Sequence, residues 1–342
     1  MAAREKKNKT SIKDVAAMAE VSTATVSHVI NGTRYVSEEV TTKVKEAMKE
    51  LNYVPNPVAR TLRSQNSHLV GLIVPVKEFT DTANAFFMIV AQGIEQTLSK
   101  NTYKLILCNS YENPDLEKEH IQMFHNQLVD GIILVPTGND YSYLADLPIN
   151  NDSPIVFIDR KPQNYQGNCV LTDNFQGAYA AAKHLIEKGH KHIGFITGEL
   201  GLTTSDKRLE GYKQALADHH LSFNEKYVKI GNASLEDGYR IAKEFMEQKE
   251  VSALFVANNV MTMGAISYFQ EHYIKIPDEM AIIGFDDYEW MKIINPSLTT
   301  VKQPAYEMGQ KAAEVILDCI KNKQEKPTDY MLDTSLIIRR SS

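Results

Sequence analysis

Apolar runs of strand length alternate with helix-like segments over most of the chain beyond residue 66. The runs are LVGLIVP (69–75), KLILCNS (104–110), DGIILVP (130–136), PIVFID (154–159), HIGFITG (192–198), ALFVAN (253–258) and AIIGFDD (281–287). Continuous apolar strands separated by helices indicate parallel sheets that helices cover on both faces. Because roughly 270 residues hold more strands than one sheet usually needs, we expect two doubly wound parallel-sheet lobes. The cleft between two such lobes is the expected ligand site.

Residues 1–52 have a different pattern, that of three short helices. The segment SIKDVAAMAE (11–20) has the serine and the acidic residue of a capping box. The segment STATVSHVING (22–32) begins with a serine cap and ends in Asn-Gly, which tolerates the left-handed conformation that ends a helix. In SEEVTTKVKEAMKELN (37–52), apolar residues recur on one helical face. Three short helices with a tight turn between the first two predict a helix-turn-helix head.

The two parts of the chain also differ in charge. Residues 1–64 contain 11 Lys and Arg against 7 Asp and Glu, whereas the remaining residues contain 26 against 36. A basic head on an acidic body favours a head that meets a polyanion, although a charged surface more often serves solvation alone.

Neither a membrane segment nor a metal site is indicated. No apolar run approaches the length of about 18 residues that spans a bilayer, and no apolar segment follows the charged amino terminus, so we expect a cytoplasmic protein without a membrane partner. The cysteines Cys108, Cys169 and Cys319 form no CxxC pair, which favours neither a disulfide framework nor a thiolate site. His190 and His192 flank a predicted turn and are interpreted as structural. We expect no metal and no cofactor.

The second helix of the head has two unlike faces. At 3.6 residues per turn, its apolar face comprises Val26, Val29 and Ile30, and its opposite face comprises Thr23, Ala24, Ser27 and His28. Small polar groups on a short helix allow close entry into a DNA major groove, where they bond phosphates or base edges. The alternative is an exposed surface helix with no special role.

Further motifs run in order along the chain: DGIILVP, FIDR, HLIEKGHKHIGFITG, RLEGYKQAL, IPDEMAIIGFDD and LTTVKQPAYEMGQKAAEVIL. Together with IKDVAAMAEVSTATVSHVINGTRYVSEEVTTKVKEAMKELNYVPNPVARTL (12–62), they resemble the lactose/galactose repressor family of bacterial transcription regulators. The resemblance implies a homodimer whose heads bind a palindromic operator DNA. It also implies a body, like that of periplasmic binding proteins, that responds to a small molecule.

The resemblance implies DNA-binding positions in the head. Base reading is assigned to Thr23, Ala24 and His28. Phosphate contact is assigned to Ser11, Thr25, Ser27, Asn31 and Tyr35, and Ile12 is added to the DNA-binding set. For Thr25 the alternative is support of the helix cap. The motif VSHVIN is similar to the purine and ribose repressor branch, and an imidazole at His28, shorter and less charged than the guanidinium of many members, should alter the base preference.

Residues 53–66 are interpreted as a hinge helix or linker. Asn56 and Pro57 make a good helix start, but the helix that follows is too short to be stable alone. The resemblance places Ala59 and Leu62 in the minor groove, with Arg60 in the DNA-binding set, and Leu62 would wedge into a base step and kink the DNA. The alternative is that Leu62 packs against the body. We expect Leu62→Ala to weaken operator binding far more than thermal stability; equal losses in both would contradict the wedge.

The expected domain limits place the head at 1–52 and the linker at 53–66. The first lobe takes 67–172 and 303–328, and the second takes 173–302 and 329–342. By resemblance to the family and to periplasmic sugar-binding proteins, the effector positions are Asn84, Phe86, Phe87, Asp159, Arg160, Arg208, Asn258 and Asp286. These fall at or beyond the carboxyl ends of predicted strands, where open α/β sheets bind ligands. Each also has an ordinary alternative, such as core packing, helix capping or ion pairing. Trp290 is expected either to stack on a sugar face or to pack in the core.

The effector class is inferred from departures from the purine repressors. Where they place a purine-contacting Arg and a stacking Phe, this chain has Leu202 and Ala233, and Arg160 replaces an aromatic residue. We therefore favour a monosaccharide or sugar acid, sensed by a repressor of carbohydrate utilisation. This chain has Asn258-Asn259 where the family usually has an Asn-Asp pair, so the resemblance does not fix the charge at this part of the effector site. The alternative is a purine-responsive or protein-corepressor-dependent regulator of the same family. An enzyme or a plain sugar-binding protein is more remote, because no nucleophile elbow, phosphate loop, zinc pair or dinucleotide turn is present.

Overall fold

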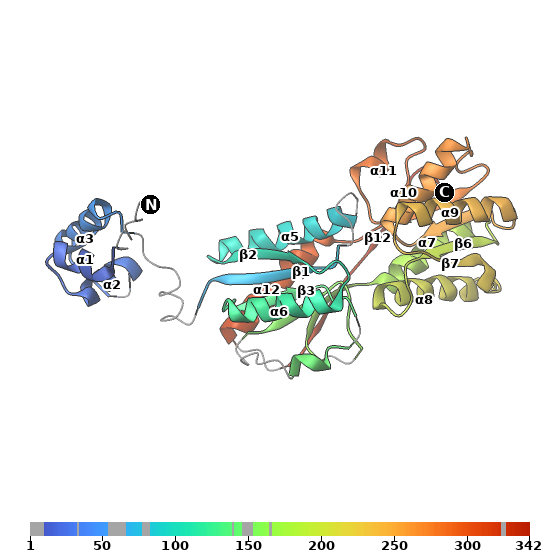
Figure 1. Ribbon diagram of the computed structural model, residues 1–342. Helices are drawn as coiled ribbons and strands as arrows, with labels where there is room; N and C mark the ends of the chain where they lie inside the picture. Colours follow the sequence, from blue (N-terminus) through green and yellow to red (C-terminus); the bar gives the residue numbers. More distant parts are fainter. Residues whose placement is uncertain are drawn as a thin grey trace, which may run out of the picture. The chain divides into compact units, whose positions relative to one another are not determined.

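The computed structural model describes residues 10–32, 34–53, 66–76, 83–138, 140–145, 153–163, 166–322 and 326–342. Residues 1–67 and residues 68–342 form two compact units, a small helical head and a larger α/β body (Figure 1). Among the described helices, none has the length and apolar character needed to cross a bilayer.

The head consists of α1 (Ile12–Met18), α2 (Thr23–Asn31) and α3 (Glu38–Glu50), as the sequence predicts. The caps are those expected. The Ser11 N–H donates to the Asp14 carboxylate at 2.8 Å, and the Thr25 N–H donates to the Ser22 hydroxyl at 3.0 Å. Gly32 ends α2 with a φ of +64°.

A small apolar core joins the three helices of the head. Val15, Val26 and Val44, one from each helix, are fully buried in it. Burial of each such side chain contributes about 1.5–3 kcal/mol to the stability of the folded head.

The first lobe of the body is a six-stranded parallel sheet with the order β11–β5–β4–β3–β1–β2. In that order the strands are Asp329–Leu332, Asn168–Thr172, Ile155–Ile158, Gly131–Leu134, Leu69–Val74 and Lys104–Asn109. Helices α5 (Ala83–Lys100) and α12 (Ala305–Asn322) cover one face, and α6 (Pro114–Asn126) covers the other. The short 3₁₀ helix η1 spans Ser142–Ala145.

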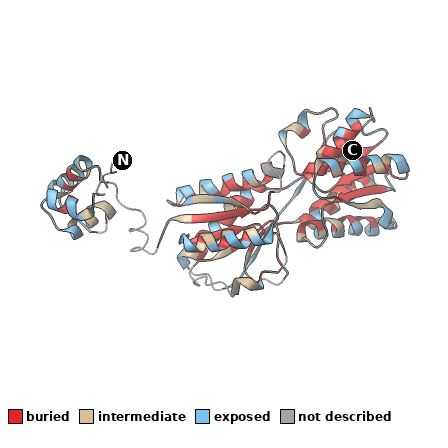
Figure 2. Cartoon of the chain, viewed as in Figure 1, coloured by how far each residue is buried: buried red, intermediate tan, exposed pale blue. Residues whose placement is uncertain are grey.

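The second lobe repeats this plan with the strand order β12–β10–β9–β8–β6–β7. In that order the strands are Ser335–Ile337, Thr299–Lys302, Ala281–Phe285, Ala253–Val256, Ile193–Thr197 and Val228–Ile230. Helices α7 (Asn174–Glu187) and α8 (Thr203–Asp218) cover one face, and α9 (Leu235–Gln248) and α10 (Asn259–Glu271) cover the other. The short helices α11 and η2 span Glu289–Ile293 and Glu225–Tyr227. In both lobes the central strands are buried, and the outer helix faces are exposed (Figure 2).

Two details differ from the sequence expectation. Strand β12 runs antiparallel to β10, so the second sheet is not wholly parallel. The expected lobe boundary at residue 329 is wrong, because β11 (329–332) pairs with β5 of the first sheet. The chain therefore passes from the first lobe to the second for the last time between Leu332 and Ser335. The boundary was misplaced because β11 is an edge strand with alternating exposure rather than a continuous apolar run.

Candidate functional site

The predicted recognition helix, α2, has the two faces that the sequence indicates. Val26 is fully buried in the head core, and Val29 and Ile30 pack against it. Thr23 and Ala24 are exposed, whereas Ser27 and His28 are half-buried. The head thus presents small polar groups on a helix whose orientation the core fixes.

The other predicted DNA-binding residues lie in varied settings. Ser11 is exposed at the start of α1, and Tyr35 is 90% exposed. Ile12 packs against the head core, and the Thr25 hydroxyl bonds the Ser22 hydroxyl at 2.8 Å, as its capping alternative predicts. Asn31 ends α2, but its side chain lies outside the description. Ala59, Arg60 and Leu62 also fall outside the described residues.

Two aspartates occupy equivalent positions in the two lobes of the body. Asp159 follows β4 and Asp286 follows β9, and each strand is third from the same end of its sheet order. Both residues have a positive φ, 66° and 64° respectively, and both are buried. Repetition of the lobe plan therefore places one strained, buried carboxylate in each lobe, at the carboxyl end of the third strand of its sheet.

Burial dominates the electrostatics of these two carboxyls. It raises the pKa of Asp159, against the attraction of Arg160 and Arg208. It raises the pKa of Asp286 to about 6, although Arg208 and a hydrogen bond from Gln303 oppose the shift. A buried carboxylate keeps its charge only with donors nearby, so a ligand that offers hydroxyl donors would be stabilised here.

Arg208 lies beside both aspartates and is held rigidly. Its Nε donates to the Asn174 side chain at 2.7 Å, and one terminal nitrogen donates to the Ala257 carbonyl at 2.8 Å. Its guanidinium carbon lies 3.6 Å from the centre of the Phe285 ring, close enough for a cation–π contact. Burial lowers its pKa, but Asp286 and Asp159 favour its charged form.

Arg160, which replaces an aromatic residue of the purine repressors, has most of its hydrogen-bond donors taken by other residues of the chain. Its two terminal nitrogens donate to the Glu112 carboxylate at 2.9 and 2.7 Å, and one of them also donates to the Pro136 carbonyl. Its Nε lies 3.8 Å from the Asp159 carboxylate and has no hydrogen-bond partner among the described residues. Glu112 was missed because it lies 48 residues away in sequence and follows a different strand.

Gln303 is a second residue that sequence reasoning missed. Its amide nitrogen donates to Asp286 at 2.7 Å, and its amide oxygen accepts from the Thr172 hydroxyl at 2.6 Å. It therefore orients Asp286 from the segment that crosses between lobes. Gln303 follows β10 directly. If LTTVKQ had been interpreted as a strand, Gln303 would have been identified as a candidate, because ligands bind at the carboxyl ends of strands.

A cavity of about 210 Å³ lies where the lobes meet. Its lining includes Phe86, Asp286, Tyr288 and Gln303. The Phe86 and Phe87 rings are 5.2 Å apart in an edge-to-face arrangement, with Phe86 buried and Phe87 half-buried. This volume suits a ligand smaller than a drug-sized molecule, for which pockets of about 300–1,000 Å³ are usual.

Of the nine predicted effector residues, only Phe86 and Asp286 are among the described residues that line this cavity. Asn258 caps α10 by accepting from the Met261 N–H at 2.9 Å, which is its capping alternative. Trp290 packs against the core on the α9–α10 side of the second lobe. Asn84 lies in the first turn of α5, and its side chain is outside the description.

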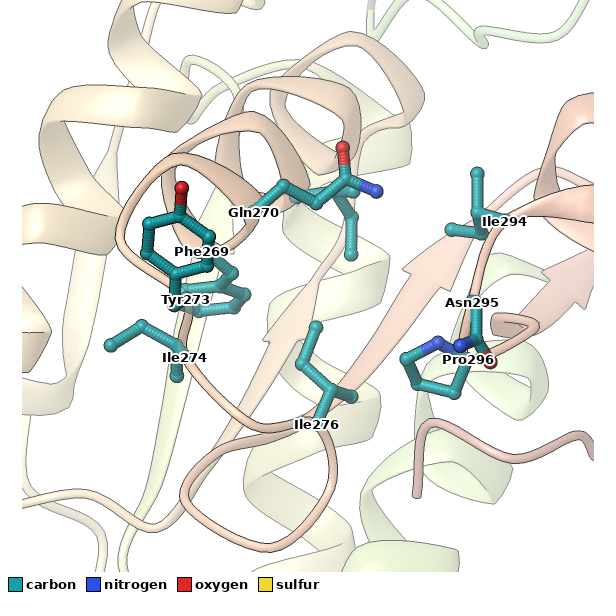
Figure 3. A pocket seen from close by; sticks show the side chains of 9 residues that line it. Phe269, Gln270, Tyr273, Ile274, Ile276, Ile294, Asn295 and Pro296 are labelled. Carbon is teal, nitrogen blue, oxygen red and sulfur yellow. The ribbon is translucent and has the colours of Figure 1, made fainter.

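A second cavity, of about 190 Å³, lies within the second lobe between α10 and the segment 294–296 (Figure 3). Its lining is mainly apolar, with Phe269, Ile274 and Ile276 on one side and Ile294 and Pro296 on the other. None of the predicted effector residues lines it. The junction of the lobes therefore remains the candidate effector site.

Comparison with known proteins identifies the family. The domain family described as "Bacterial regulatory proteins, lacI family" matches residues 11–56, and "Periplasmic binding protein-like domain" matches residues 182–342. The HTH-type transcriptional repressor PurR of Haemophilus influenzae (strain PittGG) is 37% identical over 334 residues, which cover 96% of this chain and 98% of that repressor. The chain belongs to the lacI family of bacterial regulatory proteins.

Solved structures of the lacI family agree with the observed fold. The Lac repressor dimer bound to operator and the anti-inducer ONPF is 25% identical, with a TM-score of 0.85 over 98% of this chain and 99% of that chain. A lacI-family regulator from Enterococcus faecium with bound ribose is 27% identical, with a TM-score of 0.71 over 80% of this chain and 98% of that chain. The protein is a DNA-binding transcriptional repressor, and the enzyme alternative is set aside.

Proposed function

We propose that this protein is a repressor of a carbohydrate-utilisation operon whose DNA binding is controlled by a monosaccharide or sugar acid in the cleft between its two lobes. The observation that supports this proposal best is that Asp159 and Asp286 are both buried and that Arg208 is held beside both of them. Carboxylates accept from sugar hydroxyls and the guanidinium donates to them, while Phe86 offers an apolar face to a ring. The ribose bound to the Enterococcus faecium regulator supports this assignment.

In the head, Thr23, Ala24 and His28 are proposed to read bases, and Ser11, Thr25, Ser27, Asn31 and Tyr35 to contact phosphates. A single head supplies few base contacts, so a homodimer on a palindromic operator is part of the proposal. The Lac repressor dimer bound to operator supports this arrangement.

A purine-responsive regulator is the second candidate. It is favoured by the name PurR, which several curated relatives carry at 34–37% identity. Against it stand Leu202, the half-buried residue before α8, and Ala233, a small exposed residue with a φ of +55°, because neither offers a guanidinium or a stacking ring.

A thermal-shift screen of the purified protein distinguishes the two candidates. The ligands are ribose, glucose, galactose, their acids and phosphates, hypoxanthine and guanine. A ligand at about 100 times its Kd stabilises the protein by about 2.7 kcal/mol, which moves the melting temperature measurably. A shift with a saccharide is expected; a shift with the purines alone would transfer the assignment to the second candidate.

Titration of duplex DNA against salt tests the head. An affinity that falls steeply with salt and depends on sequence is expected. Sequence-independent binding at all salt concentrations would contradict operator recognition.

A further inference from the structure

The pair formed by Arg160 and Glu112 is the least expected feature of the charged cluster around Asp159. Both terminal nitrogens of the guanidinium meet the two carboxylate oxygens, and the side chains are only 13% and 19% exposed. Such a two-bond contact between half-buried partners is directional and strong, so it fixes the orientation of the guanidinium. The pair also cancels the positive charge that Arg160 brings to the cleft.

The turn that carries Glu112 is itself built rigidly. Tyr111 and Glu112 both have a positive φ, 53° and 55°, a strained conformation for residues other than glycine. The Asn109 side chain accepts from the Tyr111 N–H at 3.1 Å, and Asn113 caps α6 by accepting from the Asp115 N–H at 2.9 Å. The backbone on both sides therefore holds Glu112 in place against Arg160.

The charge balance of the cleft follows from this pairing. Asp159 and Asp286 lie near the guanidinium of Arg208, whose described hydrogen bonds go to Asn174 and the Ala257 carbonyl rather than to a further carboxylate. Next to Asp286, the Asp287 carboxylate is taken by Arg339 at 2.6 Å. Lys302 and Glu307 both line the cavity, and their opposite charges cancel in the charge balance. With both carboxylates ionised, the cleft has an excess of one negative charge.

We propose that Glu112 determines the specificity of the effector site, because it neutralises and orients Arg160 and so restricts the effector to uncharged polyhydroxyl compounds. This proposal rests on the function proposed above and narrows it. An anionic sugar acid or sugar phosphate would meet two carboxylates with one guanidinium to offset them. A neutral sugar donates hydroxyl protons to the carboxylates and accepts from Arg208 and the Arg160 Nε.

Glu112→Gln tests the proposal, since it keeps the shape of the side chain and removes its charge. Calorimetric titration of the full-length protein compares glucose with glucuronate, galactose with galacturonate, and ribose with ribose 5-phosphate. The wild type is expected to prefer the neutral member of a pair by about tenfold or more, and Glu112→Gln is expected to shift the ratio towards the anion by about tenfold.

Two further variants separate this role from a structural one. Glu119→Gln removes an equal charge from the exposed face of α6, and it should leave the ratio unchanged. The double variant Glu112→Gln with Arg160→Gln removes both charges, so it should return the ratio to the wild-type value. Far-ultraviolet circular dichroism checks the folding of each variant. If Glu112→Gln alone unfolds, the double variant is compared with Arg160→Gln. The two should have the same ratio of affinities for the neutral and the anionic saccharide, because Glu112 acts only through Arg160.

The outcomes distinguish the two proposals. A wild type that prefers an anionic saccharide, or a Glu112→Gln protein with an unchanged ratio, overturns the role of Glu112 and leaves saccharide control intact. A wild type that binds none of the saccharides but binds hypoxanthine overturns the proposed function, and the role of Glu112 with it.

Discussion

At the scale of single residues, the carboxyl of Asp286 makes the stability of the body depend on pH. Burial raises its pKa from 3.8 to about 6 in the folded protein, so over that interval the folded chain holds a proton that the unfolded chain has released. The stability contributed by the protonated form is complete below the unfolded pKa and is lost as pH rises through about 6. We expect Asp286→Asn to stabilise the body at neutral pH by about 3 kcal/mol, and the gain to shrink as pH falls towards 4.

The neighbouring Asp287 is the matched control. Burial would raise its pKa, but hydrogen bonds from Arg339 and Thr300 outweigh burial and lower it. Its contribution to stability is therefore present above the unfolded pKa and lost as pH falls. Thermal melts from about pH 4 to 7.5 should show Asp287→Asn as destabilising by a nearly constant amount, because its contribution is lost only below the unfolded pKa of 3.8. Parallel pH profiles for the two variants would contradict the assignment.

His28 offers a residue-scale test of base reading. We expect His28→Ala to weaken binding to an operator selected from random duplexes by about 1–3 kcal/mol, because one specific base contact is lost. Binding to scrambled duplex should change little. Fluorescence anisotropy measures both affinities.

Val26→Ala is the control for His28→Ala, since Val26 is fully buried in the head core. It should destabilise the head by about 1–3 kcal/mol and reduce binding to both duplexes through unfolding. If His28→Ala also weakened both duplexes equally, His28 would contact the backbone rather than a base.

The sequence predicted part of the effector cleft at this scale. The family resemblance assigned Asp159, Asp286 and Arg208 to the effector site, and the structure places both aspartates close enough to Arg208 to influence its charge. Their role in effector binding stays a prediction. The pairing of Arg160 was not predictable, since its partner Glu112 depends on how two separate strand ends meet. Gln303 was missed because its strand contains threonines rather than a continuous apolar run.

At the scale of elements, α5 and α12 pack backbone to backbone through two glycines. A Cβ added at Gly309 would lie 2.0 Å from the Val90 carbonyl oxygen, and one at Gly93 would lie 2.2 Å from that of Tyr306. Neither obstacle is a side chain that can turn away. We expect Gly309→Ala to push the helices apart and destabilise the body by at least about 1–3 kcal/mol in chemical denaturation.

Gly138→Ala serves as the control for the helix contact, because a Cβ there meets nothing within 4 Å. Its midpoint of denaturation should stay close to that of the wild type. A Gly309→Ala protein as stable as Gly138→Ala would show that the two helices can separate without cost.

Seven of the strands were predicted, and the five that were missed share a physical reason. The predicted strands are buried or paired runs of apolar residues, such as β8 (253–256), whose four residues are all buried. The missed strands are β5, β7, β10, β11 and β12. Most are short, lie at sheet edges or next to crossings, and carry polar residues; β7 (228–230), for example, has no buried residue. Their conformation depends on a neighbouring strand that is distant in sequence, and local periodicity does not report such a neighbour.

At the scale of the whole molecule, the head and the body are separate compact units that must be energetically coupled for an effector to control DNA binding. Linkage requires that operator DNA change the effector Kd by the same factor by which the effector changes the operator Kd. A body consisting of residues 68–342 contains the whole effector cleft, so it should bind the effector as the DNA-free full-length protein does. Calorimetric titration with and without operator should reveal a shift, of about 5- to 150-fold, in the full-length protein alone. The direction of the shift assigns the effector as inducer or corepressor, whereas equal effector affinities with and without operator would contradict effector control.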